Sequence, residues 1–298
     1  MYAVSSVDSP GAWAHFVASY LIHQAGWVYL FGQVGSDPPL PEWPQPHEPP
    51  PTTGTCFVYV TSPAATAAGG TDVLRIRVSA NDVLFTFFRR GDGTLPVWDP
   101  GVGDFGDWVD IGGTEEFGAS FDSTYRGTDD IVLHATDRSV AVMWGELGLW
   151  AGYATSSVVT PEVPVPALGQ GSDPFPLALV ELADLDDGIP STNPDQIPAV
   201  CLTEAGDEAD EAFVVTQWGA PASLVTRTPI AWGSSVPVQT AVQAGLMQRD
   251  TSSDPYYLRG TLPGLFLTSA ATPLTLLRTL STGDDYLVVG GGWAFGPL

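Results

Sequence analysis

The chain has 298 residues, and 34 acidic against 10 basic residues give it a formal net charge of −24. This charge repels nucleic-acid phosphates and anionic lipid headgroups, so direct nucleic-acid and membrane partners are not expected. All basic residues are arginines, and the absence of lysine excludes mechanisms that need a Walker or Schiff-base lysine. The charge favours a halophilic source, because a Debye length of about 3 Å at 1 M salt screens self-repulsion. Compositional drift toward arginine is the alternative.

The composition predicts a mainly β protein. Gly 33 and Pro 27 accompany a hydrophobic fraction of 44%, which is typical of short strands joined by glycine and proline turns. We expect antiparallel sandwich or barrel-like sheets, one N-terminal amphipathic helix and proline-rich extended arms, in a single β-rich unit of residues 1–298. Its expected parts are a helix with the first strand (1–36), a proline-rich arm (37–52), a first β half (53–160), a proline-rich crossover (161–176) and a second β half (177–298).

The first predicted element is a helix from Pro10 to about Ala25. Ser9 and Pro10 suit the N-cap and first helical positions, and Gly26 suits the end. An apolar stripe with helical spacing is formed by Trp13, Phe16, Val17, Tyr20 and Leu21. His15 and His23 lie on one face of this helix, and we interpret them as partly buried polar positions rather than metal ligands, because no third ligand is suggested.

The proline-rich arm carries eight prolines between Pro38 and Pro51, which prevents helix and central-strand formation. A surface loop is one interpretation. The other is an arm that docks on a neighbouring subunit, with Trp43 as its anchor, since buried aromatic side chains are the usual anchors of interfaces. Phe175 has the same predicted role in the crossover. On this interpretation, Trp43→Ala leaves a folded monomer that fails to assemble.

Short apolar runs predict most of the strands. We expect strands at Trp27–Phe31, Phe57–Val60, Val73–Val78, Val83–Phe88, Leu177–Leu182, Phe213–Trp218, Ser223–Arg227, Leu262–Leu267 and Tyr286–Val289. Val238–Met247 is assigned to a short helix, and residues 96–127 to long loops. Phe85, Phe87 and Phe88 are expected in the core, as are Trp27, Trp144, Trp150 and Trp218.

Residues 131–153 give the clearest strand pattern. Ile131–Leu133 is a short apolar strand, and Asp137-Arg138 is a polar break. From Ser139 to Tyr153 the segment is rich in Val, Trp and Gly, so we expect two strands around Glu146 rather than a helix.

Motifs that carry chemistry give weak signals. Gly101–Gly106 matches GxGxxG, but it follows no clear strand, and its neighbouring aspartates would repel a pyrophosphate. His134, Asp137 and Ser139 are interpreted as parts of a hairpin, and Asp184–Gly188 as a solvated turn without the spacing of a calcium loop. We therefore expect no catalytic, cofactor-binding or metal-binding residues. Cys56 and Cys201 are interpreted as buried thiols, with a long-range disulfide as the alternative.

Several segments together resemble a family of tailed-virus virion proteins encoded among head, neck and tail genes. They are Gly26–Val28, Gly152–Thr155, the spaced prolines, Gly169–Ser172 and Gly283–Val289. The chain departs from the family where Val163–Pro166 lacks the expected tyrosines. The resemblance covers about a quarter of the chain. It implies a structural protein in the virion that contacts copies of itself and other virion proteins in a symmetric ring.

The sequence thus leaves three hypotheses. The first is a non-enzymatic structural component of the neck, the tail or a related ring-like assembly, located in the virion. The second is a capsid-surface or receptor-binding protein that holds glycans on exposed aromatic side chains. The third is a β-rich glycoside hydrolase, for which the abundant carboxylates prevent the assignment of a catalytic pair.

Overall fold

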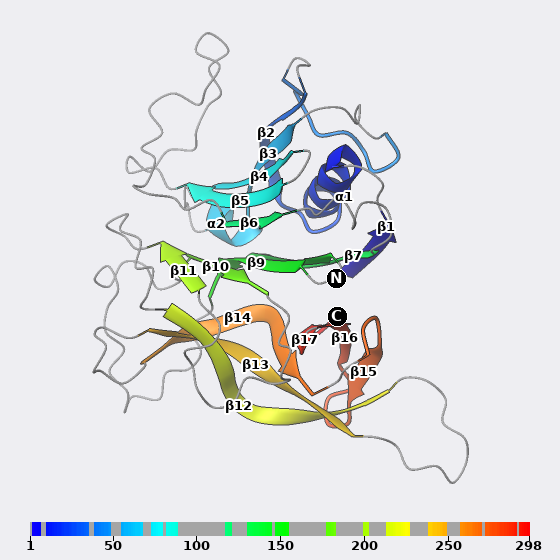
Figure 1. The fold of residues 1–298 in the computed structure, drawn as a ribbon, viewed down its shortest axis with the longest axis vertical. Helices are drawn as coiled ribbons and strands as arrows, with labels where there is room; N and C mark the ends of the chain where they lie inside the picture. The colour runs from blue at the N-terminus through cyan, green and yellow to red at the C-terminus, as the bar shows by residue number, and fades with distance from the viewer. Residues whose placement is uncertain are drawn as a thin grey trace. The chain divides into compact units, whose positions relative to one another are not determined.

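The computed structural model describes residues 2–6, 10–35, 39–48, 55–67, 73–79, 82–88, 117–120, 130–144, 147–154, 177–182, 199–202, 213–226, 238–248, 257–269, 272–290 and 292–298. These residues form antiparallel sheets, one of them closed into a barrel, with a helix near the N-terminus, as the sequence predicts (Figure 1). The chain divides into two compact units. The helical unit comprises Ala3–Arg138 with Ala205–Glu208, and the barrel unit comprises Met1–Tyr2, Ser139–Glu204 and Ala209–Leu298.

In the described part of the helical unit there are two helices and seven strands. Their bounds are β1 (Tyr2–Ser6), α1 (Pro10–His23), β2 (Val28–Val34), β3 (Cys56–Thr61), α2 (Pro63–Ala67), β4 (Val73–Val78), β5 (Asp82–Phe88), β6 (Phe117–Ser120) and β7 (Asp130–Ala135). Strands β2 to β6 form one antiparallel sheet in chain order, and β1 lies beside β7. The predicted strands at Phe57–Val60, Val73–Val78 and Val83–Phe88 are confirmed as β3, β4 and β5.

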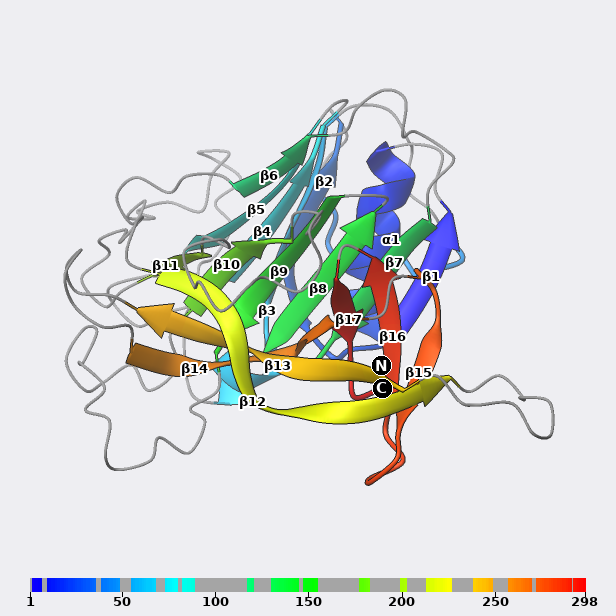
Figure 2. The same ribbon diagram turned by 60° about the horizontal axis from the view of Figure 1, so that its bottom comes forward.

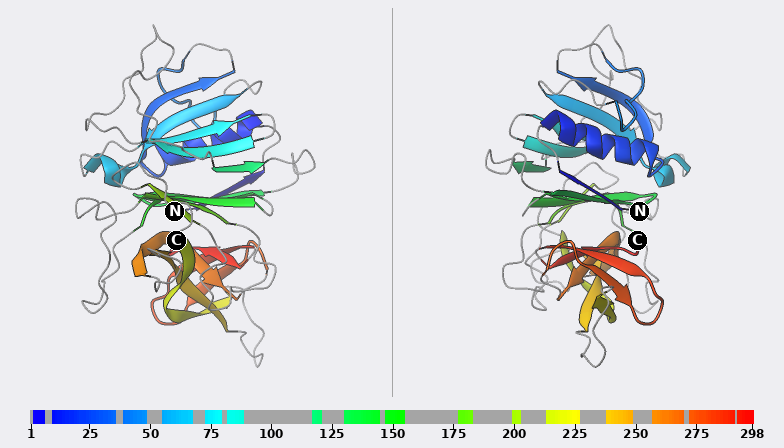
Figure 3. Two further views of the ribbon diagram at one scale, coloured as in Figure 1. Left: turned by 60° about the vertical axis from the view of Figure 1, so that its left-hand side comes forward. Right: turned by 90° about the vertical axis from the view of Figure 1, so that its right-hand side faces the viewer.

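Helix α1 packs against one face of this sheet, on β2, β3 and β4 (Figure 3). Pro10 is its first residue, and Gly26 follows its end with φ of +76°, a left-handed conformation that glycine adopts without strain. The predicted stripe is buried except for Phe16, which is partly exposed. The facing sheet residues alternate along β3 and β4 as the strand period requires, and they are Val58, Val60, Leu74, Ile76 and Val78.

The other ten strands that the structure describes belong to the barrel unit. Their bounds are β8 (Ser139–Trp144), β9 (Leu147–Tyr153), β10 (Leu177–Glu181), β11 (Ala199–Leu202), β12 (Phe213–Thr226), β13 (Gln239–Gln248), β14 (Tyr257–Thr268), β15 (Leu276–Thr279), β16 (Asp285–Gly290) and β17 (Trp293–Phe295). Strands β8 to β11 are neighbours in that order within one sheet. The predicted hairpin around Glu146 is confirmed, since Ser139–Trp144 pairs with Leu147–Gly152.

The six strands from β12 to β17 close into a barrel in the order β12-β13-β14-β17-β16-β15, with β15 pairing back onto β12 (Figure 2). Its core contains Leu224, Ala241, Phe266, Leu277, Tyr286, Val288 and Ala294. The Phe266 and Tyr286 rings meet edge to face with centroids 4.9 Å apart. Gly296 completes this packing, because a Cβ there would lie 2.5 Å from the Tyr286 ring.

At Pro263, strand β14 of the barrel forms hydrogen bonds with β8 and β9 of the neighbouring sheet in the same unit. The Pro263 carbonyl accepts hydrogen bonds from the Ser139 hydroxyl and the Trp150 indole Nε1, each at 3.0 Å. Proline cannot donate to a strand ladder, so it occupies irregular strand positions, and its carbonyl is here used by side chains instead. On the other side of this irregularity, Gln243 Nε2 donates to the carbonyls of Leu262 and Leu265, at 2.7 and 2.9 Å.

One element differs in type from its prediction. The short helix predicted at Val238–Met247 is wrong, because residues Gln239–Gln248 form strand β13 between β12 and β14. The two strands predicted within Phe213–Arg227 are a single strand, β12, whose register shifts between Trp218 and Ala222. Strand β6 lies within residues 96–127, where long loops were predicted.

Candidate functional site

Residues 39–48 of the proline-rich arm, here called the strap, lie on α1 of their own unit. Trp43, at the centre of the strap, is only 2% exposed. Its ring stacks on His15 with centroids 6.3 Å apart, and it lies at the same centroid distance from Tyr29 of β2. A Cβ on Gly32 would lie 2.8 Å from the Trp43 ring, so the absence of a side chain at Gly32 makes room for the indole.

The strap is tied to α1 through backbone carbonyls that accept from side chains of the helix. His15 Nε2 lies 3.2 Å from the Gln45 carbonyl, and His23 Nε2 lies 3.0 Å from the Pro44 carbonyl. Ser19 lies between these histidines: its hydroxyl donates to the Pro44 carbonyl at 3.4 Å and accepts the Trp43 indole Nε1–H at 3.2 Å. The polar face of the helix is therefore covered by the strap.

Strand β2 holds the first part of the strap. The Leu40 amide donates to the Gly32 carbonyl at 2.9 Å, and the Tyr29 hydroxyl donates to the Leu40 carbonyl at 2.7 Å. Burial raises the pKa of Tyr29, so this hydroxyl keeps its proton as a donor throughout the neutral range. The sequence predicts an interface anchor at Trp43. The structure places the ring inside its own chain, where it is inaccessible to a neighbour while the strap stays in place.

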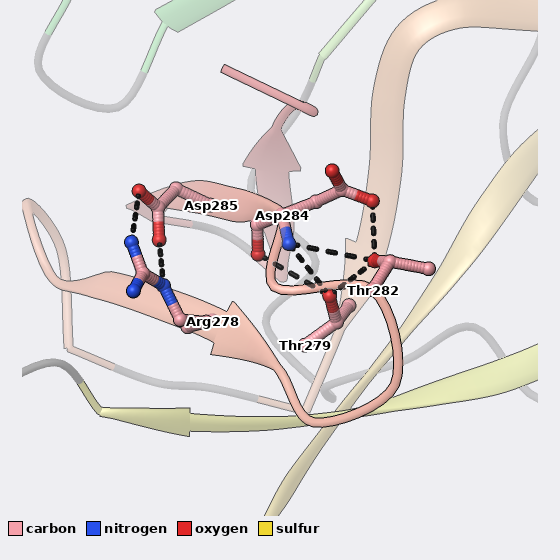
Figure 4. Close-up of polar contacts among 5 residues, drawn as sticks. All are labelled: Arg278, Thr279, Thr282, Asp284 and Asp285. Atoms are coloured by element: carbon pink, nitrogen blue, oxygen red, sulfur yellow. Dashed lines mark hydrogen bonds and ion pairs between the residues drawn. The ribbon is translucent and has the colours of Figure 1, made fainter.

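The turn between β15 and β16 is a second polar cluster (Figure 4). Arg278 and Asp285 are register partners and form a two-pronged ion pair, with Nε to Oδ1 at 2.8 Å and Nη2 to Oδ2 at 3.1 Å. The hydrogen bond to Asp285, and then its charge, raise the pKa of Arg278. This geometry fixes the last residues of β15 against the first residues of β16.

Inside that turn, two threonines bind the backbone. The Asp284 amide donates to Thr279 Oγ1 at 2.9 Å, and Thr279 Oγ1 lies 2.6 Å from Thr282 Oγ1. Thr282 in turn donates its hydroxyl proton to the Asp284 carboxylate, so Thr279 is the donor toward Thr282. Gly283 has φ of +80°, which permits the reversal. These contacts are structural: they hold the backbone of the turn.

Around this turn, the outer face of the barrel carries exposed apolar side chains. Thr279 and Leu224 are register partners and are buried, so the alternate residues point outward. Leu280, whose amide donates to the Ser223 carbonyl at 3.3 Å, is 65% exposed. Val238, on the other side of β12, is 58% exposed. We call the outward residues Ser223, Val238, Arg278 and Leu280 the outer barrel patch.

The other residues singled out in the sequence have structural roles or lie outside the described residues. Ser139 donates to Pro263, as described above, and the Asp137 carbonyl accepts the Ala64 amide at 2.8 Å beside α2. His134 is buried, and Cys56 is a buried thiol whose pKa is raised by burial. Trp27, Trp144 and Trp150 are core residues as predicted. Phe175, the crossover 161–176, Gly101–Gly106 and Asp184–Gly188 lie outside the described residues, as does the Cys201 side chain.

The partly buried state predicted for the helix histidines is confirmed. His15 is 5% exposed, and burial lowers its pKa, an effect that the nearby His23 reinforces and the Gln45 carbonyl opposes. In the part of the chain that the structure describes, no group of three or more His, Cys, Asp or Glu side chains is placed to hold a metal ion. The described helices include none that is both long and apolar enough to cross a bilayer.

Comparisons with known proteins add no family. No protein-family model matches this chain, and no curated protein matches it either.

The sequence analysis does not predict the outer barrel patch, although the sequence contains a pattern that indicates part of it. The alternation of Leu277, Arg278, Thr279 and Leu280 predicts that the arginine and the second leucine share one face of a strand.

Proposed function

We propose that the chain is a non-enzymatic structural component of a tailed-virus particle, in the neck, the tail or a related ring-like assembly. It acts there through contacts with copies of itself and with other virion proteins. The observation that carries this proposal is the outer barrel patch, where Val238 and Leu280 expose large apolar side chains on either side of β12.

A closed barrel restricts how such a protein can associate. At the outer barrel patch, β12 is paired with β13 on one side and with β15 on the other, so this part of the barrel offers no free strand edge to a partner. Association must use outward side chains instead, and apolar side chains on a rigid surface gain most from leaving water. The Arg278–Asp285 pair and the Thr279–Thr282–Asp284 contacts hold the turn that presents Leu280, which reduces the entropy lost on docking.

Two segments of the virion-protein resemblance, Gly26–Val28 and Gly283–Val289, have architectural roles in the fold, which supports the same proposal. Gly26 ends α1, and Trp27 is buried with its indole Nε1 donating to the Thr136 carbonyl at 3.1 Å. In the segment Gly283–Val289, the glycine and Asp284 shape the turn and Tyr286 fills the barrel core. These residues are the ones that a structural family would need to retain in order to keep the same surface.

The location is tested by mass spectrometry of purified particles of the virus that encodes the chain. Peptides of the chain should be recovered at a constant number of copies per particle, in a multiple that fits ring symmetry. Their absence from washed particles, with abundant peptides in the infected cell, would overturn the proposed location.

A further inference from the structure

We propose that Leu274 anchors a contact in which the barrels of two copies of this chain meet. The inference rests on the proposed function, because it names the partner of the barrel surface, and it adds a residue that lies outside the outer barrel patch.

Leu274 has a backbone conformation that leucine rarely adopts. Its φ of +57° lies in the left-handed region, and among the residues that the structure describes it is the one non-glycine residue there. It follows Pro273 in the turn that leads into β15, and a positive φ after a proline in a turn normally belongs to glycine or asparagine. A bulky side chain therefore stands here against the preference of the backbone.

The turn is held by its backbone rather than by the leucine side chain. The Leu274 amide donates to the Val288 carbonyl at 2.8 Å, and the Val288 amide donates to the Thr275 carbonyl at 3.0 Å. Val288 is fully buried in the barrel core, whereas the Leu274 side chain is 46% exposed. A strained residue whose side chain adds little to the core indicates a function for that side chain.

The exposed apolar side chains gather in the barrel. In the part of the chain that the structure describes, the large exposed ones are Val28, Val238, Leu274 and Leu280. Val28 begins β2 of the helical unit, and the other three flank barrel strands: Val238 precedes β13, Leu274 precedes β15 and Leu280 follows it. The barrel is thus the part of the described chain that gains most from leaving water.

The distribution of charge along the chain identifies the partner. Residues 212–298, which include all six barrel strands, contain four arginines and four aspartates and are neutral. The other 30 acidic residues and 6 arginines lie in residues 1–211, so that segment carries the whole net charge of −24. A protein with a basic surface would be attracted to residues 1–211 instead of the barrel.

A second copy therefore fits the barrel best. Two barrels can meet without bringing negative charge against negative charge at the contact, whereas any contact made by residues 1–211 on both copies would do so. Because each copy contributes the same apolar side chains, the contact is two-fold and closes with two copies.

Sedimentation equilibrium of the purified full chain above about 1 M salt tests this contact. We expect twice the monomer mass for the parent and a dissociation constant at least tenfold higher for Leu274→Asn, because asparagine tolerates the left-handed conformation but removes the apolar side chain. At a concentration where the parent is a monomer, the denaturation midpoint of this variant should equal or exceed that of the parent. The control Val28→Thr makes the exposed residue of the helical unit polar and should keep the parent's dissociation constant.

Three outcomes would overturn the inference: a parent that stays monomeric, a Leu274→Asn variant that dimerises like the parent, or one whose denaturation midpoint falls, since the leucine would then serve the fold. Leu274→Gly, which also suits a positive φ, repeats the test if the asparagine variant does not fold. The proposed function fails separately. A chain absent from washed particles loses its location and leaves the contact standing, whereas a particle protein whose dimer ignores Leu274 keeps its location and loses the anchor.

Discussion

Trp43 shows how a single side chain can decide between an intramolecular and an intermolecular role. Eight prolines make the surrounding segment stiff, and a stiff segment with one tryptophan predicts docking on some surface. The surface turns out to be the polar face of α1, because Ser19 and two histidines supply donors at the spacing of helical turns. The docking surface of Trp43 could not be predicted from sequence, because it depends on where β2 places Tyr29 and Gly32.

Replacement of Trp43 by alanine should therefore destabilise the isolated chain rather than only its assembly. Removal of a buried tryptophan leaves a cavity over Gly32 and removes the indole N–H that Ser19 accepts, and we expect the free energy of unfolding to fall by about 3 kcal/mol. Chemical denaturation at neutral pH measures this loss. The control Trp43→Phe keeps a ring and should lose less. Unchanged stability of the alanine variant would show that the strap does not close on α1.

At the scale of elements, local patterns identify most strands but not their lengths or partners. The alternation of apolar residues in Val73–Val78 predicts both ends of β4 correctly. The hairpin around Glu146 is predicted correctly from its composition, without a turn motif. The sequence analysis assigns Val238–Met247 to a short helix, and Gln, Ala, Leu and Met in this segment do favour a helix locally. Pairing of β13 with β12 and β14 on both sides overrides that preference, and pairing partners are not visible in a single sequence.

The β15–β16 turn allows a test at the same scale. In Thr279→Ala the Asp284 amide loses its shorter hydrogen bond and keeps only the one to Thr282 Oγ1 at 3.4 Å, so the free energy of unfolding should fall by about 1 to 2 kcal/mol. Thr279→Ser keeps the hydroxyl and should restore most of the loss. Urea unfolding of the parent and the two variants measures these free energies. An alanine variant as stable as the parent would mean that the turn is not held by this contact.

The net charge is a property of the whole molecule. At −24 the folded chain repels itself, and screening should raise its melting temperature as salt increases from about 0.1 M to above about 1 M. Thermal melts monitored by circular dichroism over this series give the sign of the effect. A melting temperature that falls steadily with salt would favour compositional drift over adaptation to high salt.

Less of the candidate site than of the fold was predictable from sequence. The helix, the strands and the buried tryptophans follow from periodicity, which a chain carries in itself. A surface patch such as Val238 with Leu280 arises when β13 and β15 pair with opposite sides of β12, because this brings residues far apart in sequence to the same outer face, and only the register reveals it. Gly283 allows the left-handed conformation of the β15–β16 turn, but the local sequence does not show which side chains this turn presents.

We propose that the chain works by association through the outer barrel patch. The molar mass of the purified chain, measured by light scattering above about 1 M salt where self-repulsion is screened, tests this association. We predict an oligomer for the wild type and a monomer for Val238→Ser/Leu280→Ser, with the denaturation midpoint nearly unchanged because both side chains are exposed. A wild-type monomer under these conditions, or a double variant that assembles like the parent, would contradict the account.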